Sequence, residues 1–207
     1  MHISEGILSA PVLVGGAIAA AAGLSIGLRR VRQENLCEIA LLSSAFFIAS
    51  LVHVPVMGAN AHLILNGLLG LVLGWAAFPA VFVALLLQAT MFQFGGITTL
   101  GLNTFILAAP AVVVSVLFSA LSRPNNIRTA SLAGAAAGAM AIMLSAALAS
   151  LALYWGGEGE TFLQLSKVLF AVHVPIMVTE GLICGFAVSF LRQVYPRLLK
   201  VAYVPEA

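Results

Sequence analysis

Charge is what this sequence lacks most. It contains no aspartate, and charged residues of every kind make up 8% of its 207 positions, whereas 62% are hydrophobic. A soluble protein carries roughly 25% charged residues. Apolar runs of this length cross a bilayer only as helices, because lipid offers no partner to an unpaired backbone polar group. We therefore expect an all-α integral membrane protein with a single domain, residues 1–207. The net charge of +2 is too small to indicate a nucleic-acid partner.

Nucleotide and catalytic-zinc motifs are also missing. The glycine-rich passage 93–104 lacks the Lys-Ser/Thr ending of a phosphate-binding loop, so we expect no nucleotide on this chain and any ATP energy to come through another subunit. His-Glu-x-x-His, the zinc-protease motif, is absent. The two cysteines, Cys37 and Cys184, lie in apolar stretches and favour packed thiols over a disulfide. No basic segment precedes the first apolar run, so we expect no cleavable signal peptide.

About seven transmembrane helices are expected, since apolar runs of roughly 20 residues are long enough to span a bilayer. The predicted spans are residues 10–28, 36–54, 62–76, 78–94, 103–121, 130–154 and 170–191. The third and fourth are short and are joined by a tight turn at Ala76–Pro79, so a partly re-entrant pair is the alternative for them. Residues 161–170 are predicted as a surface helix leading into the last span.

Lysine and arginine positions predict the orientation, because cytoplasmic loops of membrane proteins are enriched in both. Seven spans would put eight of the nine basic residues on one side, with only Lys167 opposite; the eight are Arg29, Arg30, Arg32, Arg123, Arg128, Arg192, Arg197 and Lys200. We expect that side to be cytoplasmic. The N-terminus is then outside and the C-terminus inside.

The polar head of the chain, Met1-His2, has the groups of a nitrogen chelate. Met1 should be retained, because its removal generally requires a small second residue. It then offers its amine, and His2 offers its amide and ring nitrogens. With His62 as a fourth ligand, four nitrogens in a plane suit Ni(II) or Cu(II), and Co(II) if the plane is looser. Taken alone, His62 would be interpreted as an interface histidine bonded to water or a carbonyl; a chelating head on the same side favours the ligand role.

Other polar residues in apolar surroundings have two interpretations each. His53 and His173 occupy a repeat, Val52-His53-Val54-Pro55 against Val172-His173-Val174-Pro175, which predicts either a supporting or relay role near the metal or two matched helix breaks whose histidines cap freed carbonyls. Glu180 is a functional hypothesis by default inside a span, either protonated or bonded to Asn66, Asn103 or a backbone group. Glu5 is expected to support His2 as a hydrogen-bond acceptor.

Two further patterns predict packing contacts. Thr98, Thr99 and Asn103, in the polar loop between two spans, are expected to tie that loop over the pocket and to support the ligands. Small residues at every fourth position of the first span let helices approach closely in lipid, against either this chain or a partner protein. They are Gly15, Ala19, Gly23 and Gly27.

These motifs together resemble the CbiM/NikM family, the substrate-capture subunits of energy-coupling-factor transporters for nickel and cobalt. The resemblance covers the whole chain and rests on Met1-His2-Ile3 with Glu5-Gly6, on His62, and on Gly95-Gly96-Ile97-Thr98-Thr99-Leu100-Gly101-Leu102-Asn103-Thr104. The surroundings Ala61-His62-Leu63-Ile64 and the residue Phe94 differ from the usual family pattern.

The resemblance implies capture of Ni²⁺ or Co²⁺, as transported substrate, by Met1, His2 and His62. It also implies a prokaryotic cell-membrane location and three kinds of partner: a membrane coupling subunit, a pair of ATPases and often a small accessory membrane subunit. The stripe from Gly15 to Gly27 would face the coupling subunit. The choice between nickel and cobalt stays open.

Two other functions are alternatives to metal capture. A stand-alone proton-coupled secondary transporter or channel would use Glu38, Glu180 and His173 as a proton relay. A membrane enzyme would need an open metal coordination site together with a general base. No residue set in the sequence supplies both, so we expect no enzymatic activity.

Overall fold

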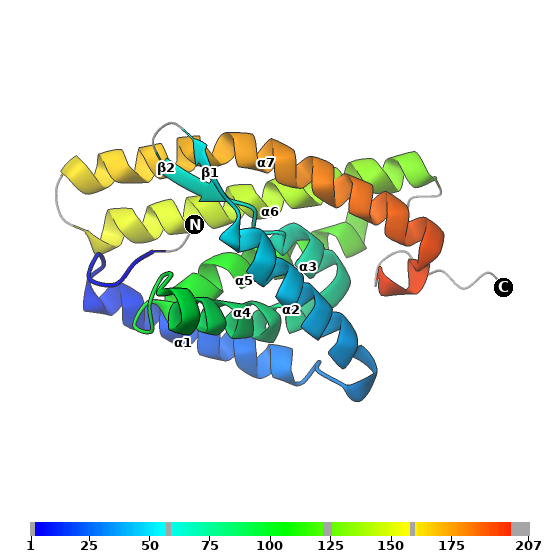
Figure 1. Ribbon diagram of the computed structural model, residues 1–207, viewed down its shortest axis with the longest axis horizontal. Coiled ribbons are helices and arrows are strands. Elements are labelled where there is room, and N and C mark those ends of the chain that lie inside the picture. Colours follow the sequence, from blue (N-terminus) through cyan, green and yellow to red (C-terminus); the bar gives the residue numbers. More distant parts are fainter. Residues whose placement is uncertain (1–2, 57–58, 122–125, 158–159, 200–207) are drawn as a thin grey trace.

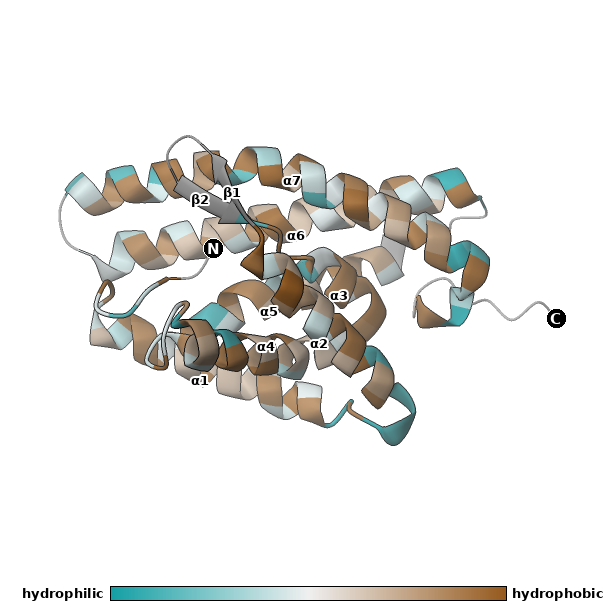
Figure 2. Ribbon diagram, viewed as in Figure 1, coloured by the Kyte–Doolittle hydropathy of each residue, from teal (hydrophilic) through white to brown (hydrophobic). Residues whose placement is uncertain are grey.

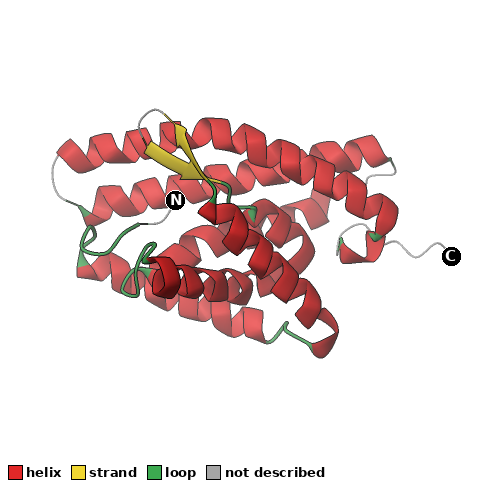
Figure 3. Cartoon of the chain, in the orientation of Figure 1, coloured by secondary structure: helices red, strands yellow, loops and turns green. Residues whose placement is uncertain are grey.

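The computed structural model describes residues 3–56, 59–121, 126–157 and 160–199, with the backbone alone at 53–56, 59–61 and 120–121. Its described part is a bundle of helices with one small hairpin of two strands (Figures 1 and 3). In chain order the elements are α1 (Ala10–Leu28), the 3₁₀ turn η1 (Gln33–Asn35), α2 (Leu36–Leu51), β1 (His53–Val56), β2 (Ala59–His62), α3 (Asn66–Leu73), η2 (Gly74–Ala76), α4 (Ala77–Phe92), α5 (Leu100–Leu121), α6 (Ile127–Gly156), α7 (Glu160–Val194) and η3 (Pro196–Leu198).

Hydrophobic residues occur all along the helices of this bundle (Figure 2), and many of their side chains are exposed. On α7, for example, Val178, Leu182, Phe186 and Phe190 are all more than half exposed. Side chains of this kind are stable on an outer face only where lipid replaces water. The expected all-α membrane protein is confirmed, with the β1–β2 hairpin as an addition.

Six candidate membrane spans are present among the described residues, one fewer than the seven expected. They are Ala10–Leu28, Gln33–Leu51, Asn66–Phe92, Leu100–Ser119, Ile127–Gly156 and Glu160–Val194. The difference lies in Asn66–Phe92, where two spans were predicted. Helix α3 has only eight residues, about 12 Å of helix, and cannot cross a hydrocarbon core of about 30 Å.

Within Asn66–Phe92 the chain turns back on itself at η2. Helix α3 runs parallel to α5, because the Asn66 side chain bonds the Leu107 carbonyl and Gly74 lies beside Ser115. Helix α4 runs parallel to α2, because Ser43 bonds the Ala80 carbonyl and Gln88 bonds Ser50 further along both helices. Gly74 makes the reversal possible with a positive φ of 58°. The pair α3–α4 is thus a hairpin inside the bundle, and its turn at η2 lies close to the one expected at Ala76–Pro79.

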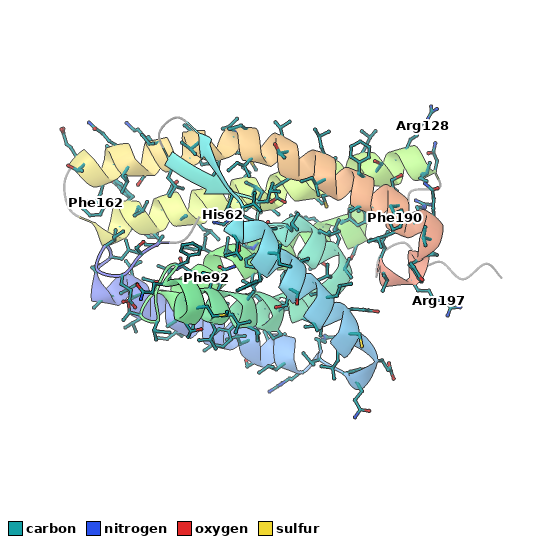
Figure 4. The ribbon with its side chains drawn as sticks, viewed as in Figure 1. His62, Phe92, Arg128, Phe162, Phe190 and Arg197 are labelled. Atoms are coloured by element: carbon teal, nitrogen blue, oxygen red, sulfur yellow. The ribbon has the colours of Figure 1, made fainter. Side chains whose placement is uncertain are left out.

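The helix bundle has two distinct ends. The start of α1, the loop 93–99 and the end of α6 gather at the left of Figure 1, where Ser9 donates to the Gly156 carbonyl at 2.9 Å. The end of α7 lies at the other end, together with Arg128 and Arg197 (Figure 4). The predicted clustering of basic residues at one end therefore holds for these two.

Helices α6 and α7 pack along their length through small residues on both. A Cβ added at Gly138 of α6 would lie 2.6 Å from the Cys184 Cβ and 2.9 Å from the Glu180 carbonyl oxygen of α7. On the facing side, one added at Gly185 would lie 2.9 Å from the Ser131 carbonyl oxygen. Close backbone approach of this kind is the usual way in which helices associate in lipid. It also brings the Glu180 backbone close to α6.

Helix α7 corrects two predictions. Residues 161–170 do not form a separate surface helix but the first turns of α7, which runs without interruption from Glu160 to Val194. The two copies of the repeat do not break helices in a matched way either. Pro55 lies in strand β1 after α2 has ended, whereas Pro175 lies inside α7. Packing of α7 along α6 supports the helix across Pro175, as neighbouring helices commonly do in membranes. At Pro55 the backbone pairs with strand β2 instead.

The packing of Gly138 generates a stability prediction. We expect Gly138→Ala to lower the unfolding free energy by about 1–3 kcal/mol, because the new methyl group has no space between α6 and α7. Gly15→Ala is the matched control, since nothing lies within 4 Å of a Cβ built there, and its effect should be within about 1 kcal/mol of zero or stabilising. Thermal unfolding of both variants in detergent checks this; equal midpoints would contradict the packing described.

Candidate metal-capture site

The loop 93–99 lies against the N-terminal head of the chain. Glu5 donates its backbone N–H to the Gly95 carbonyl at 3.2 Å. Its carboxylate oxygen Oε1 accepts from the Thr98 N–H at 2.8 Å and from the Thr98 hydroxyl at 3.1 Å. Gly96, with φ 137°, permits this contact, because a side chain there would collide with that of Glu5. Hydrogen bonds from Thr98, first from its backbone N–H and then from its hydroxyl, hold the pKa of the Glu5 carboxyl below its usual value of 4.5.

Asn103 of α5 clamps the backbone of Ile3. Its Oδ1 accepts from the Ile3 N–H at 3.0 Å, and its Nδ2 donates to the Ile3 carbonyl at 3.0 Å. Nδ2 also donates to the Thr99 hydroxyl at 3.2 Å, which in turn donates to the Gly96 carbonyl at 3.3 Å. Asn103 and Ile3 are both buried. The chain is thus held at the residue that directly follows the predicted ligand His2, while Met1 and His2 themselves lie outside the described residues.

His62 ends strand β2 and is 97% buried, with 3% of its surface exposed; Figure 4 places it between the hairpin and the helices. Its ring nitrogen Nδ1 lies 2.9 Å from the Leu63 carbonyl oxygen. A carbonyl can only accept, so Nδ1 carries the proton and the lone pair is on Nε2. This is the tautomer that a histidine needs in order to bind a metal through Nε2.

The segment that follows His62, here called the strap (residues 63–65), enters the bundle and forms neither helix nor strand. Glu180 of α7 accepts the N–H of Ile64, and it accepts the N–H of Leu65 at 2.8 Å on Oε1 and 3.0 Å on Oε2. Glu180 is buried. Of the partners foreseen for Glu180 in the sequence, the structure confirms the backbone group.

Asn66 anchors the chain directly after the strap. Its Nδ2 donates to the Leu107 carbonyl of α5 at 3.1 Å and to the Ser145 hydroxyl of α6 at 2.8 Å. The sequence indicated Asn66 only as a possible partner of Glu180, and Ser145 was missed. A fully buried amide in an apolar run was the available signal, because such a group must find partners inside the bundle.

The remaining predicted supporting residues have the following places. Thr98, Thr99 and Asn103 hold the loop 93–99 and the head together, and their support of the ligands stays a prediction. Glu5 bonds Thr98; its support of His2 stays a prediction. The side chain of His53 lies outside the described residues, although its backbone pairs with that of His62 in the hairpin. Among the described residues no three of His, Cys, Asp and Glu gather as a metal site, and of the predicted ligands only His62 is among them.

Among the described residues, the His173 ring bonds only its own helix. It is buried in α7, and its Nδ1 bonds the Leu169 carbonyl at 2.7 Å. The carbonyl that Pro175 deprives of its helical donor is that of Ala171, so the expected capping of a freed carbonyl is wrong. The His173 Nε2 has no hydrogen-bond partner among the described residues.

The small-residue stripe of α1 divides between two roles. Gly23 lies under the Phe78 ring, and Gly27 lies against the Trp75 carbonyl oxygen, 2.6 Å from a Cβ built there. These two serve internal packing, because the stripe winds around α1 and its second half meets the α3–α4 hairpin. Gly15 has no atom within 4 Å of an added Cβ, and Ala19 lines an apolar groove of about 610 Å³ between α1 and α5.

The Thr98–Glu5 contact predicts a measurable titration. We expect the Glu5 carboxyl to titrate below 4.5. Thr98→Val should raise its pKa towards that value, because the hydroxyl donor is lost. The lowered pKa also gives the direction of the pH dependence. At a pH above the ordinary pKa of Glu the contact stabilises the docked head, and this stabilisation is lost as the pH falls through the lowered pKa. Carboxyl ¹³C NMR measures this. Thr90→Val is the control, since Thr90 bonds only carbonyls of its own helix; an unchanged Glu5 titration in Thr98→Val would contradict the contact.

Comparison with known proteins places this arrangement in a family. A family model described as the cobalt uptake substrate-specific transmembrane region, CbiM, matches residues 2–198. A putative metal transport protein of Haemophilus influenzae is 42% identical over 200 residues, which are 96% of this chain and 97% of that protein. The cobalt transport protein CbiM of Kyrpidia tusciae is 31% identical over 221 residues, covering 100% of this chain and 89% of the relative.

A fused relative and a solved structure agree with this. The putative fused cobalt transport protein CbiMQ of Methanocorpusculum labreanum is 30% identical, with 95% of this chain matching 36% of its length. A crystal structure of a truncated transition metal transporter has a TM-score of 0.75 and 25% identity over 93% of this chain and 99% of that one. The chain therefore belongs to the CbiM/NikM family of cobalt and nickel transport proteins, whose members are multi-pass membrane subunits of transporters and not enzymes.

Proposed function

We propose that this chain captures Ni²⁺ or Co²⁺ for import through the Met1 amine, the His2 amide and ring nitrogens, and His62. The observation that carries the proposal is the double hydrogen bond between Asn103 and the Ile3 backbone. A chelating head has to be held where its ligands can converge, and this clamp acts at the residue next to His2. The His62 tautomer supports the same ligand set, because Nε2 carries the lone pair.

Helix α5 keeps the two parts of this ligand set in register. Asn103 holds the head, and four residues later the Leu107 carbonyl receives Asn66, which anchors the strap. Positions four apart lie on one face of a helix, about one turn from each other. A rigid element therefore fixes the separation between the head and His62.

The ligand chemistry favours late first-row divalent ions. Four nitrogens in a plane suit Ni(II), and Co(II) is accommodated where the plane is looser. Relatives named for cobalt and for nickel transport match this chain, which is consistent with a site between these two preferences. Because the amine, amide and imidazoles must lose protons before they bind, capture weakens as pH falls.

Assembly with an ATP-driven transporter is part of the proposal. The fused relatives carry a second transporter component on the same chain, which supports partner subunits for this one: a coupling membrane protein, ATPases and a small accessory subunit. Gly15 and Ala19, with the groove beside them, remain accessible on α1 for the coupling protein. Retention of a co-expressed coupling subunit during purification tests this assembly.

A proton relay through Glu180, as a stand-alone transporter would need, is disfavoured. Both Glu180 oxygens accept strap N–H groups, so the carboxylate acts as an anchor. Negligible concentrative metal uptake by liposomes that contain this chain alone is the corresponding expectation under the capture proposal.

Loss of ligands or of the clamp should weaken capture by different amounts. We expect His2→Ala to abolish Ni²⁺ binding in isothermal titration, because the ring nitrogen is lost together with the chelate ring that it closes with the amide nitrogen. Asn103→Ala should weaken binding by roughly 10- to 100-fold, the usual effect of losing a group that orients a ligand.

Two control variants accompany this measurement. Thr104→Val changes the residue next to Asn103, whose hydroxyl bonds only the Leu100 carbonyl of its own helix. Ser119→Ala removes a hydroxyl that bonds only the Ser115 carbonyl of its own helix. Both should bind Ni²⁺ as the unaltered chain does. Undiminished binding in His2→Ala would end the proposed ligand set.

The orientation has a test built into the chain. Cys37 is exposed near η1 at the basic end, and Cys184 is buried. We expect a membrane-impermeant maleimide to leave Cys37 unlabelled in intact spheroplasts and to label it after permeabilisation, because basic ends are cytoplasmic. Cys37→Ser is the control for labelling at Cys184. Labelling of intact spheroplasts would reverse the orientation and put the head in the cytoplasm.

A further inference from the structure

We propose that Glu180 is a positioning residue for His62, and that it orients and polarises the imidazole through a single peptide unit, Leu63–Ile64. This inference rests on the proposed function, in which His62 binds the metal. It assigns a role to a buried carboxylate of α7 that is not itself one of the proposed ligands.

The geometry is a chain of two hydrogen bonds across one peptide plane. The N–H of Ile64 donates to Glu180, and the carbonyl of Leu63, which belongs to the same peptide unit, accepts from the His62 Nδ1–H. Hydrogen bonds that share a polar group strengthen one another in a low-dielectric interior. The carboxylate thereby makes the Leu63 carbonyl a stronger acceptor, which favours the Nδ1–H tautomer and raises electron density at Nε2.

Metal-binding histidines commonly donate their second nitrogen to a carboxylate or a carbonyl, which fixes the ring and raises its basicity. Here the carbonyl is in contact with His62 and the carboxylate lies one peptide unit behind it. Both parts of that arrangement are therefore present in series. In this protein the carboxylate does not touch the ring but acts on it through one peptide unit.

The strap also needs an external acceptor. Residues 63–65 form neither helix nor strand, and Leu65 has a positive φ of 57°, a conformation that a leucine rarely adopts. Unpaired N–H groups are costly inside a membrane protein. Glu180 satisfies those of Ile64 and Leu65 with one side chain, so the backbone path from His62 into α3 depends on this residue.

Close helix packing brings Glu180 to the strap. On one side, Gly138 of α6 lies against the Glu180 carbonyl of α7. On its other side, the Gly138 Cα is 2.6 Å from a Cβ built at Gly67 of α3. Three helices therefore meet at Gly138 with little side-chain volume between them. The Glu180 carboxylate consequently reaches the segment just before α3, where the strap N–H groups are.

Three substitutions at Glu180 test the proposal on the full chain, with Ni²⁺ as the probe. Glu180→Ala removes both acceptor oxygens, and should weaken Ni²⁺ binding by roughly 10- to 100-fold. Its Ni(II) visible absorption at saturation should shift towards that of His62→Ala. Glu180→Gln keeps a carbonyl oxygen and should lie between Ala and the unaltered chain in affinity. Glu180→Asp withdraws the carboxylate and should also weaken binding.

Gln88→Ala is the matched control, because Gln88 is equally buried but its side chain bonds Ser50 and not the strap. It should keep the unaltered affinity and absorption. Unaltered affinity and absorption in Glu180→Ala would overturn the inference, as would an equal loss in Gln88→Ala. If Glu180→Ala does not fold, Glu180→Asp decides, and unaltered binding there overturns it.

These measurements distinguish a wrong ligand set from a wrong role for Glu180. If the unaltered chain binds no Ni²⁺, or if His62→Ala binds it with unaltered absorption, the proposed ligand set is wrong. If His62→Ala alters the absorption and Glu180→Ala does not, the ligand set stands and the role of Glu180 is wrong.

Discussion

Asn103 holds the backbone of Ile3 through both its N–H and its carbonyl, and one turn further along the same helix the Leu107 carbonyl receives Asn66. These bonds join two segments that are otherwise far apart in the chain, the N-terminal head and the strap after His62. Neither segment is helical, so neither can position itself through its own hydrogen bonds. Their relation to each other depends on α5, and the proposed capture of a metal depends on that relation.

Lipid imposes the need for such clamps. A helix satisfies its own backbone, but the strap and the loop 93–99 interrupt the helical pattern inside a membrane protein, and each of their polar groups needs a partner. The described structure supplies these partners with few side chains, chiefly Glu5, Glu180 and Asn103. Irregular backbone of this kind occurs in membrane proteins where it lines a functional cavity, which is consistent with its place beside the proposed ligands.

Glycine makes the clamps geometrically possible. At Gly138 three helices meet, so a carboxylate on α7 comes close enough to bond the strap. At Gly96 the absence of a side chain admits Glu5 to the loop 93–99. The same residue type that was interpreted as a partner-binding stripe on α1 thus serves internal contacts at Gly23 and Gly27, and leaves Gly15 to the outside. Spacing alone does not separate these roles, because a stripe of period four winds around a helix of period 3.6.

Some features of the protein follow from the order of residues alone. Apolar run length determines that the chain spans a membrane as helices, and residue types at the head and in the loop 93–104 indicate a metal-transport family, since ligand chemistry and turn glycines are local properties. Local pattern was insufficient where a segment depends on its neighbours. Of the two copies of Val-His-Val-Pro, one lies in a strand and the other in a continuous helix, which packing against α6 supports past its proline. Residues 161–170 are likewise part of α7.

Tertiary structure alone decided which helices the hairpin of residues 66–92 packs against, that Glu180 bonds the strap, and that α5 links the head to His62. These are contacts between residues some 40 to 115 positions apart, and hydrophobic periodicity contains no information about which distant polar groups meet. The sequence shows that a buried polar side chain needs a hydrogen-bond partner. Which group becomes that partner depends on the tertiary structure.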